Sequence, residues 1–254
     1  MQGTTTSPGL IPRALEFVFN NITTRPNPFY KPLHYSDVIN LNALERAQEL
    51  EAKTKLLTFS SMEKHQYMNT YKQMQKLLQE ESIRPSQCYD AHYSVWVSFA
   101  EIYNEIVYDL LSSECQKKRM PLKLGADSNG RAFIKGLKTI YVNSAAEAYQ
   151  ILMAGQYNLK VAATALNAKS SRSHCIFTII LLKYYAENLP DRVEVSTYVL
   201  FFLLFLIFYI NLYTTCSLLV FILNKISKFN NYIRIFVLYN YEEAKIYYIN
   251  FFKS

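Results

Sequence analysis

The residues best suited to chemistry lie in one short stretch, Asn167–His174, which reads Asn-Ala-Lys-Ser-Ser-Arg-Ser-His. Serine hydroxyls ligate hard cations such as Mg²⁺ or orient a water molecule. An arginine among them pairs with a carboxylate or with phosphate charge. The alternative interpretation is a polar loop before a strand, in which the serines hydrogen-bond to the backbone of turns.

Two elements must position this stretch. Ser144, followed three residues later by Glu147, is typical of a capped helix N-terminus, and a helix is predicted over Ser144–Ala163. Its buried stripe is predicted to comprise Ala145, Ala148, Ile151, Leu152 and Gly155. The apolar run Cys175–Leu182 predicts a strand directly after the polar stretch.

Helical spacing and strand-like apolar patterns also occur in other segments. Alternation in the first part of His92–Leu111 predicts a buried strand. Short strands joined by turns are expected over Leu122–Val142. Helical spacing predicts three more helices, at residues 12–22, 41–57 and 67–78. Alternating strands and helices indicate a mixed α/β fold.

The spacing N-x-x-S-S-R-S-H resembles switch I of the kinesin motor family. A second match, S-F-x-E-I-Y-N-E-x-x-Y-D-L-L at Ser98–Leu111, resembles a central-sheet strand of that family and its following turn. Met1–Leu15 resembles the segment just after the P-loop. The resemblance implies an incomplete P-loop NTPase motor domain, with a mixed central sheet flanked by helices. It also implies ATP and Mg²⁺ as cofactors and the microtubule (tubulin) as partner.

The resemblance assigns roles within the polar stretch. It places the Ser171 hydroxyl near Mg²⁺, while Ser170 and Asn167 hold the γ-phosphate and the attacking water. Such positioning suits phosphoryl transfer, which depends on orientation and charge neutralisation. By the same resemblance, Arg172 pairs with a glutamate of switch II when the site closes.

The last two residues, Ser173 and His174, are expected to shape the loop. Glu101 and Glu105 in the second match have the residue type of an acid/base pair. No second catalytic group lies at suitable spacing, so a structural role is favoured for both.

A long insertion at about residues 25–85, and the pattern of Lys31–Leu41 within it, resemble the sixth, cytokinesis family of kinesins. That likeness implies a cytoplasmic, cytoskeletal protein of the mitotic spindle or midzone. Arg131, Lys135 and Lys138 are candidate contacts with the acidic microtubule surface. Solvated surface lysines are the alternative explanation for them.

Parts of the motor pattern are not found in this sequence. Residues Gly125–Gly130 have G-x-x-x-x-G spacing but no Lys-Ser/Thr follows, so a β-turn is expected there instead of a P-loop. The switch II sequence D-L-A-G-S-E is absent after Thr197. We therefore expect a partial motor domain at residues 1–196, starting just downstream of its nucleotide cradle, and no ATP turnover by this chain alone.

The remaining residues, 197–254, are rich in Phe, Tyr, Leu, Ile and Asn. Residues 198–223 hold 26 residues without a charge, enough for an apolar helix that crosses a bilayer. The competing interpretation is translated intron sequence, because these residues have AT-rich codons. A membrane partner is expected only if the helix is real. The alternative function is then a non-catalytic, membrane-anchored pseudomotor or interaction protein.

Composition also bears on which partners and which kinds of site this protein has. The net charge of +7 favours acidic partners. No run of five Lys or Arg residues occurs, so a nucleic-acid-binding arm is not indicated. The four cysteines lack C-x-x-C spacing, which argues against a zinc site or a disulfide framework. No Ser/His/Asp or Cys/His set indicates a hydrolase unrelated to ATP. The oligomeric state is not defined by these patterns.

Overall fold

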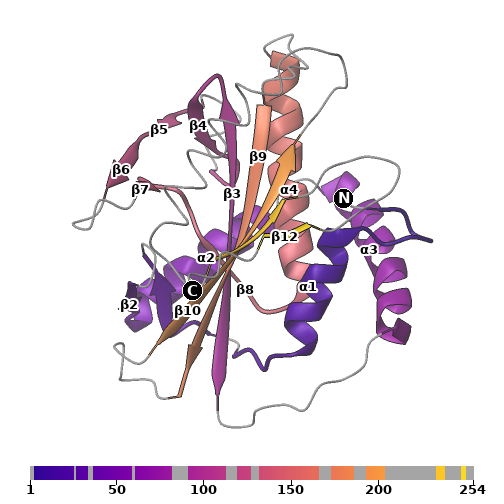
Figure 1. The fold of residues 1–254 in the computed structure, drawn as a ribbon, viewed down its shortest axis with the longest axis horizontal. Coiled ribbons are helices and arrows are strands. Elements are labelled where there is room, and N and C mark those ends of the chain that lie inside the picture. The colour runs from indigo at the N-terminus through magenta and orange to yellow at the C-terminus, as the bar shows by residue number, and fades with distance from the viewer. Residues whose placement is uncertain are drawn as a thin grey trace.

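The computed structural model describes residues 3–25, 27–33, 37–58, 61–81, 91–112, 119–126, 132–165, 173–185, 193–203, 233–237 and 247–249. Within these residues the strands and helices form a mixed α/β fold, as predicted (Figure 1). The helices are α1 (Leu10–Asn20), α2 (Ala43–Thr58), α3 (Ser61–Glu81) and α4 (Ala145–Ala165).

The main sheet has the order β12-β11-β10-β9-β3-β4-β5, and β8 also pairs with β3. Neighbouring strands are antiparallel except β10 and β11, which are parallel. Its strands are β3 (His92–Tyr103), β4 (Ile106–Asp109), β5 (Pro121–Leu122), β8 (Ile140–Val142), β9 (Ser173–Tyr184), β10 (Glu194–Leu203), β11 (Ile233–Val237) and β12 (Tyr247–Ile249).

Two small hairpins accompany this sheet. One joins β1 (Tyr30–Pro32) to β2 (Val38–Asn40) inside the insertion. The other pairs β6 (Leu124–Ala126) with β7 (Ala132–Ile134). Ala126 pairs antiparallel with Ala132, but residues 127–131 lie outside the described residues, so the β-turn expected there stays a prediction.

Strand β3 is buried on both faces of the sheet. Val95, Val97 and Phe99 point into one core cluster, which includes residues of α1, α3 and α4. Trp96 points into a second cluster on the other face, and its Nε1–H donates to the Tyr30 carbonyl oxygen at 3.1 Å. Successive side chains of a strand point to opposite faces, so one strand serves both cores.

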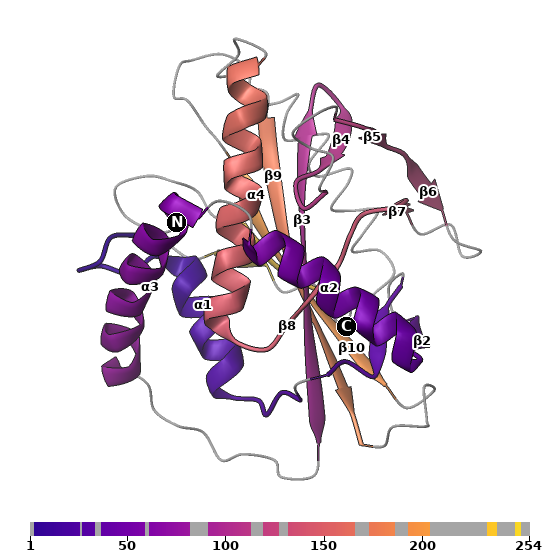
Figure 2. The ribbon, with the colours of Figure 1, turned by 180° about the vertical axis from the view of Figure 1, so that it is seen from behind.

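The helices gather beside the sheet, with α1, α3 and α4 side by side in both views (Figures 1 and 2). The Tyr71 ring of α3 stacks on Tyr149 of α4 at 4.6 Å between centroids. The Tyr71 hydroxyl donates to buried Glu16 of α1 at 2.5 Å. Helix α2 begins with a reciprocal cap between Asn42 and Glu45. The insertion is therefore packed against the helices of the motor-like core.

The tail differs from the expected apolar helix at its start. Strand β10 continues to Leu203 and pairs with β9 along its whole length, so residues 198–203 are strand. An uncharged apolar run fits a buried strand as well as a membrane helix, and hydropathy alone does not separate the two. Residues 204–223 lie outside the described residues. Among the helices that the structure describes, none combines the length and apolar character needed to span a membrane.

Candidate functional site

The helix that leads to the polar stretch is anchored at its N-terminus. The Ser144 hydroxyl accepts the Glu147 backbone N–H at 3.2 Å, which confirms the predicted cap. The Glu147 carboxylate returns to the Asn143 N–H at 2.8 Å and also accepts from the Lys53 ammonium at 3.0 Å. Lys53 is 6% exposed and lies 5.4 Å from the centre of the Tyr141 ring. A partly buried ion pair therefore ties α2 to the first turn of α4.

The middle of α4 packs closely on the sheet. A Cβ built on Gly155 would lie 2.3 Å from Cδ1 of Phe99, so only a glycine lets the helix approach β3 this closely. The Phe99 ring in turn meets Phe177 of β9 edge-on at 5.6 Å. Further along α4, the Asn158 amide donates to the Leu110 carbonyl oxygen at 2.8 Å. These contacts fix the direction of α4 relative to β3 and β9.

Strand β9 is the next described element after α4, and residues 166–172 connect the two. Ser173 is the first residue of β9 and pairs with Tyr103 of β3. His174 lies between Ile102 of β3 and Leu203 of β10. Both views place the C-terminal end of α4 and the start of β9 at the same end of the molecule (Figures 1 and 2).

The His174 side chain is partly buried at this end of the sheet. Its Nδ1 atom is buried and has no hydrogen-bond partner within the part of the chain that the structure describes. Burial lowers the pKa of His174, because a charged imidazolium loses its hydration there. The ring is therefore neutral at neutral pH and adds no positive charge beside the polar stretch.

Most of the nucleotide-site residues that we predicted from the sequence lie outside the residues that the structure describes. Asn167, Ser170, Ser171 and Arg172 lie outside it, so their roles stay predictions. The structure does show that residues 166–172 connect the end of α4 to the start of β9, between two elements held by the contacts above.

Two of the three candidate tubulin contacts, Lys135 and Lys138, are on the connection from β7 to β8. Arg131 lies outside the described residues, whereas the side chains of Lys135 and Lys138 are exposed. Gly136 between them has a φ of +77°, which a residue with a side chain rarely adopts. The Lys138 backbone N–H donates to the Asp109 carboxylate at 3.1 Å. Contact of these lysines with tubulin stays a prediction.

The structure contains two ion pairs that the sequence analysis did not predict. Glu101 is 4% exposed and forms an ion pair with Arg119, which supports its structural role. The Arg119 guanidinium lies 4.2 Å from the centre of the Tyr108 ring. The cap pattern marked Glu147, but nothing local marked Lys53 as its partner, because the two lie 94 positions apart.

The sequence model described as the kinesin motor domain matches residues 1–202. The chain belongs to the kinesin motor domain family. This confirms the resemblance read from Asn167–His174 and Ser98–Leu111. The match extends to residue 202, past the boundary that we placed at Ser196, in agreement with the course of β10.

Curated relatives and a solved structure give a consistent result. Kinesin-like protein KIF20A of Bos taurus is 32% identical over 236 residues, covering 77% of this kinesin chain and 27% of that protein. Kinesin-like protein subito of Drosophila melanogaster is 34% identical over 196 residues, covering 72% and 30%. A solved structure titled "kinesin 6" has a TM-score of 0.55 at 22% identity, covering 79% of this chain and 53% of that one, and it shows the fold alone. This kinesin chain thus spans about a third or less of the curated relatives' length.

Proposed function

We propose that residues 1–202 serve as part of a microtubule motor of the sixth kinesin family, in which ATP binding and hydrolysis drive movement along microtubules. The observation that carries this proposal is the connection of α4 to β9 by a segment that reads N-x-x-S-S-R-S-H. By the same likeness, we propose a cytoskeletal location at the spindle or midzone.

The residue types of this segment fit Mg²⁺ and ATP. Serine hydroxyls are hard oxygen ligands, so Ser171 would hold the metal and Ser170 the γ-phosphate. Asn167 would orient the attacking water through its amide, and Arg172 would pair with a carboxylate as the site closes. When bound, Mg²⁺ neutralises the charge on the phosphates during transfer. The neutral His174 adds no charge of its own beside this segment.

The fold supports a switch at this position. A segment that a γ-phosphate orders and that is released after hydrolysis must be flanked by elements with a fixed position. Helix α4 has such a support in its cap and in its contact with Phe99. Strand β9 has one in its pairing with β3 and β10. Movement of residues 166–172 would therefore be local to the nucleotide.

Turnover also needs groups that the 254 residues do not contain. No G-x-x-x-x-G-K-[ST] motif occurs, and no D-x-x-G motif occurs after Thr197. We therefore propose that the 254-residue polypeptide alone does not hydrolyse ATP. Mg²⁺-dependent ATP turnover by this purified polypeptide, abolished by Ser171→Ala, would show this part of the proposal to be wrong.

The first test is to sequence the mature transcript across the codons for Val195, Ser196 and Thr197, and upstream of the codon for Met1. The motor proposal expects the transcript to encode an Asp-Leu-Ala-Gly-like sequence downstream of Ser196 and a P-loop upstream of Met1. A transcript that matches the present chain at both ends would argue against an ATP-driven motor.

The second test uses the protein translated from that transcript. Microtubule-stimulated ATP turnover is expected, and Ser171→Ala should lower it by about a hundredfold or more. Thr54→Ala is the matched control, because that exposed hydroxyl donates to the Leu50 carbonyl oxygen within its own helix, α2. Equal loss of turnover in both variants, or none in either, would contradict the role of Ser171.

A further inference from the structure

Residues 3–9 form a short loop that leads into α1 (Figure 1). The loop contains the dipeptide Ser7-Pro8, and in the whole sequence no other serine or threonine directly precedes a proline. Ser7 is exposed, whereas Pro8 is buried. Proline-directed protein kinases phosphorylate a serine or threonine that precedes a proline, and the missing backbone N–H of proline gives them a feature to recognise. The loop therefore contains the minimal sequence that such a kinase needs.

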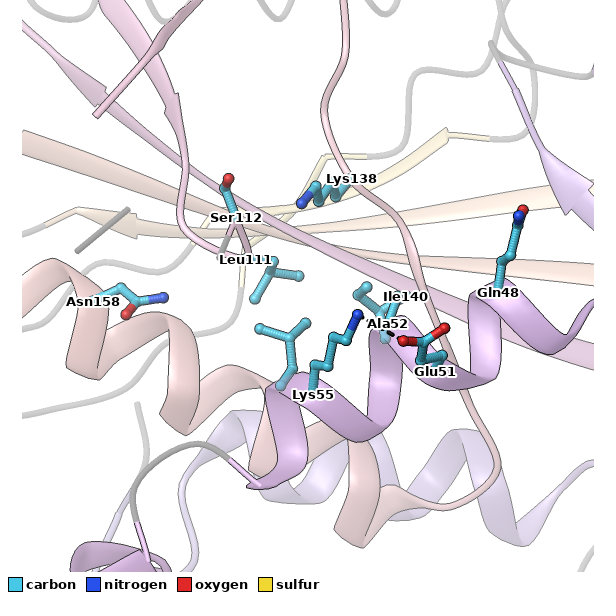
Figure 3. A pocket seen from close by; sticks show the side chains of 10 residues that line it. Gln48, Glu51, Ala52, Lys55, Leu111, Ser112, Lys138, Ile140 and Asn158 are labelled. Carbon is cyan, nitrogen blue, oxygen red and sulfur yellow. Dashed lines mark ion pairs between the residues drawn. The ribbon is translucent and has the colours of Figure 1, made fainter. Parts of the chain in front are cut away.

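Ser7 differs in exposure from the other serines whose side chains the structure describes. The other serines are either buried (Ser94 and Ser98) or half-buried (Ser112, Ser144 and Ser196). Ser112, for example, lines a cavity between α2 and α4 (Figure 3). A kinase must enclose the hydroxyl that it phosphorylates. Among these serines, Ser7 is therefore the one that a second protein can reach.

The loop is held by its own hydrogen bonds. The Thr4 backbone N–H donates to the Ser7 carbonyl oxygen at 2.9 Å, and the Ser7 N–H donates to the Thr4 carbonyl oxygen at 3.2 Å. The Ser7 N–H also lies 3.1 Å from the Thr4 hydroxyl oxygen, which in turn is 3.2 Å from the Thr6 hydroxyl. These bonds can open without the loss of any hydrogen bond of α1. The loop can therefore extend into the cleft of a kinase while the helix stays folded.

Two features next to Ser7 favour a phosphate group. Helix α1 begins at Leu10 without a side-chain cap and without an acidic residue in its first turn, so no negative charge of that turn faces the positive end of the helix dipole. The Arg13 Nε–H donates to the Pro8 carbonyl oxygen at 3.1 Å, which holds the guanidinium beside the loop. A phosphoserine carries a charge of about −1.5 to −2 at neutral pH. On Ser7 this charge would lie near both features.

We propose that Ser7 is a phosphorylation site for a proline-directed protein kinase. The Ser7 hydroxyl oxygen attacks the γ-phosphorus of ATP, its proton passes to a base of the kinase, and ADP leaves with the electron pair of the broken P–O bond. The phosphate on Ser7 then stabilises the start of α1 through the helix N-terminus and Arg13. The site does not depend on the proposed motor function, since every group that forms it lies within residues 3–13.

The test uses the purified 254-residue chain and ATP labelled in its γ-phosphate. Two proline-directed kinases, one cyclin-dependent and one mitogen-activated, are added in separate reactions, and mass spectrometry locates the label. We expect label on Ser7, which Ser7→Ala removes and which Pro8→Ala also removes although it keeps the hydroxyl. Thr6→Ala is the matched control and should keep the label, because Thr6 is exposed in the same loop and does not precede a proline.

The outcomes of this labelling separate the site from the class of kinase. Absence of label on the wild type with both kinases, or equal label on the wild type and Ser7→Ala, would overturn the proposal. Label that persists in Pro8→Ala would overturn the proline-directed class. Circular dichroism checks that each variant is folded, and Ser7→Ala decides the question if Pro8→Ala does not fold.

Thermal unfolding tests the contact of the phosphate with α1. At low salt the phosphorylated chain should melt about 1–4 °C higher than the untreated chain. The rise should shrink at high salt and in Arg13→Gln, because salt screens the charge and the substitution removes the guanidinium. Ser7→Ala treated with the same kinase should show no rise. Equal melting temperatures with and without phosphate on Ser7 would overturn the contact with α1 and Arg13.

Discussion

Replacement of Gly155 by alanine should destabilise this protein, although alanine is the better helix former. The new Cβ would lie 2.3 Å from Cδ1 and 2.9 Å from Cε1 of Phe99, far inside normal contact distance. The Phe99 ring is 1% exposed and packs edge-on against Phe177, so it has little room to move. Overpacking of a protein core lowers the free energy of unfolding by up to about 3 kcal/mol in typical cases.

The helix propensity of alanine offsets part of this cost. Alanine is favoured over glycine in a helix by about 1 kcal/mol, so Gly155→Ala should lower the free energy of unfolding by about 2 kcal/mol. The comparison of Lys160→Ala with Lys160→Gly measures the propensity difference in α4 itself, because Lys160 is exposed. The melting temperature should fall by about 4–8 °C.

Urea unfolding followed by tryptophan fluorescence is the assay. Trp96 is the only tryptophan of the chain and is fully buried in β3, so its emission reports loss of the sheet. The double variant Gly155→Ala with Phe99→Leu should recover part of the loss, as expected for two residues in contact. If Gly155→Ala is as stable as the wild type or more stable, the close approach of α4 to β3 is refuted.

Two further predictions concern single backbone and side-chain features. Asn104 and Glu105, which join β3 to β4, have φ of +47° and +65°, and such turns favour Asn-Gly. Glu105→Gly should therefore raise the free energy of unfolding by about 1 kcal/mol in urea melts, and a gain no larger than that of Glu105→Ala would contradict this. Burial raises the pKa of Asp109 from 3.8 to about 6, so the folded state holds this proton more tightly than the unfolded state. The wild type should lose about 2 kcal/mol of stability between pH 4 and pH 6 relative to Asp109→Asn, measured by urea unfolding, and a difference independent of pH would exclude this burial effect.

Sequence periodicity was sufficient for the main elements. Alternation of apolar side chains identified β3, and helical spacing with the Ser144–Glu147 cap identified α4. These signals are local, since they depend on residues a few positions apart that share one face of an element. Family membership came from the type and order of residues in Asn167–His174 and Ser98–Leu111, which needs no knowledge of packing.

The conformation of the uncharged run after residue 197 could not be decided in this way. Its residues suit a buried strand and an apolar helix equally well by hydropathy. The neighbour decides between them: β9 offers a complete ladder of backbone partners, and residues 194–203 add to it as β10. Pairing of this kind depends on the placement of another strand in space, which the local pattern does not encode.

The sequence by itself determined that the chain is a kinesin-type α/β protein with a polar segment between a helix and a strand. Only the tertiary structure decided how that segment is supported. It brings Lys53 to Glu147, sets Gly155 against Phe99, and leaves a cavity between α2 and α4 with Asn158 at its inner end. Each of these contacts joins elements that are distant in the chain. Their geometry follows from how the helices pack on the sheet, and no pattern within a single segment specifies it.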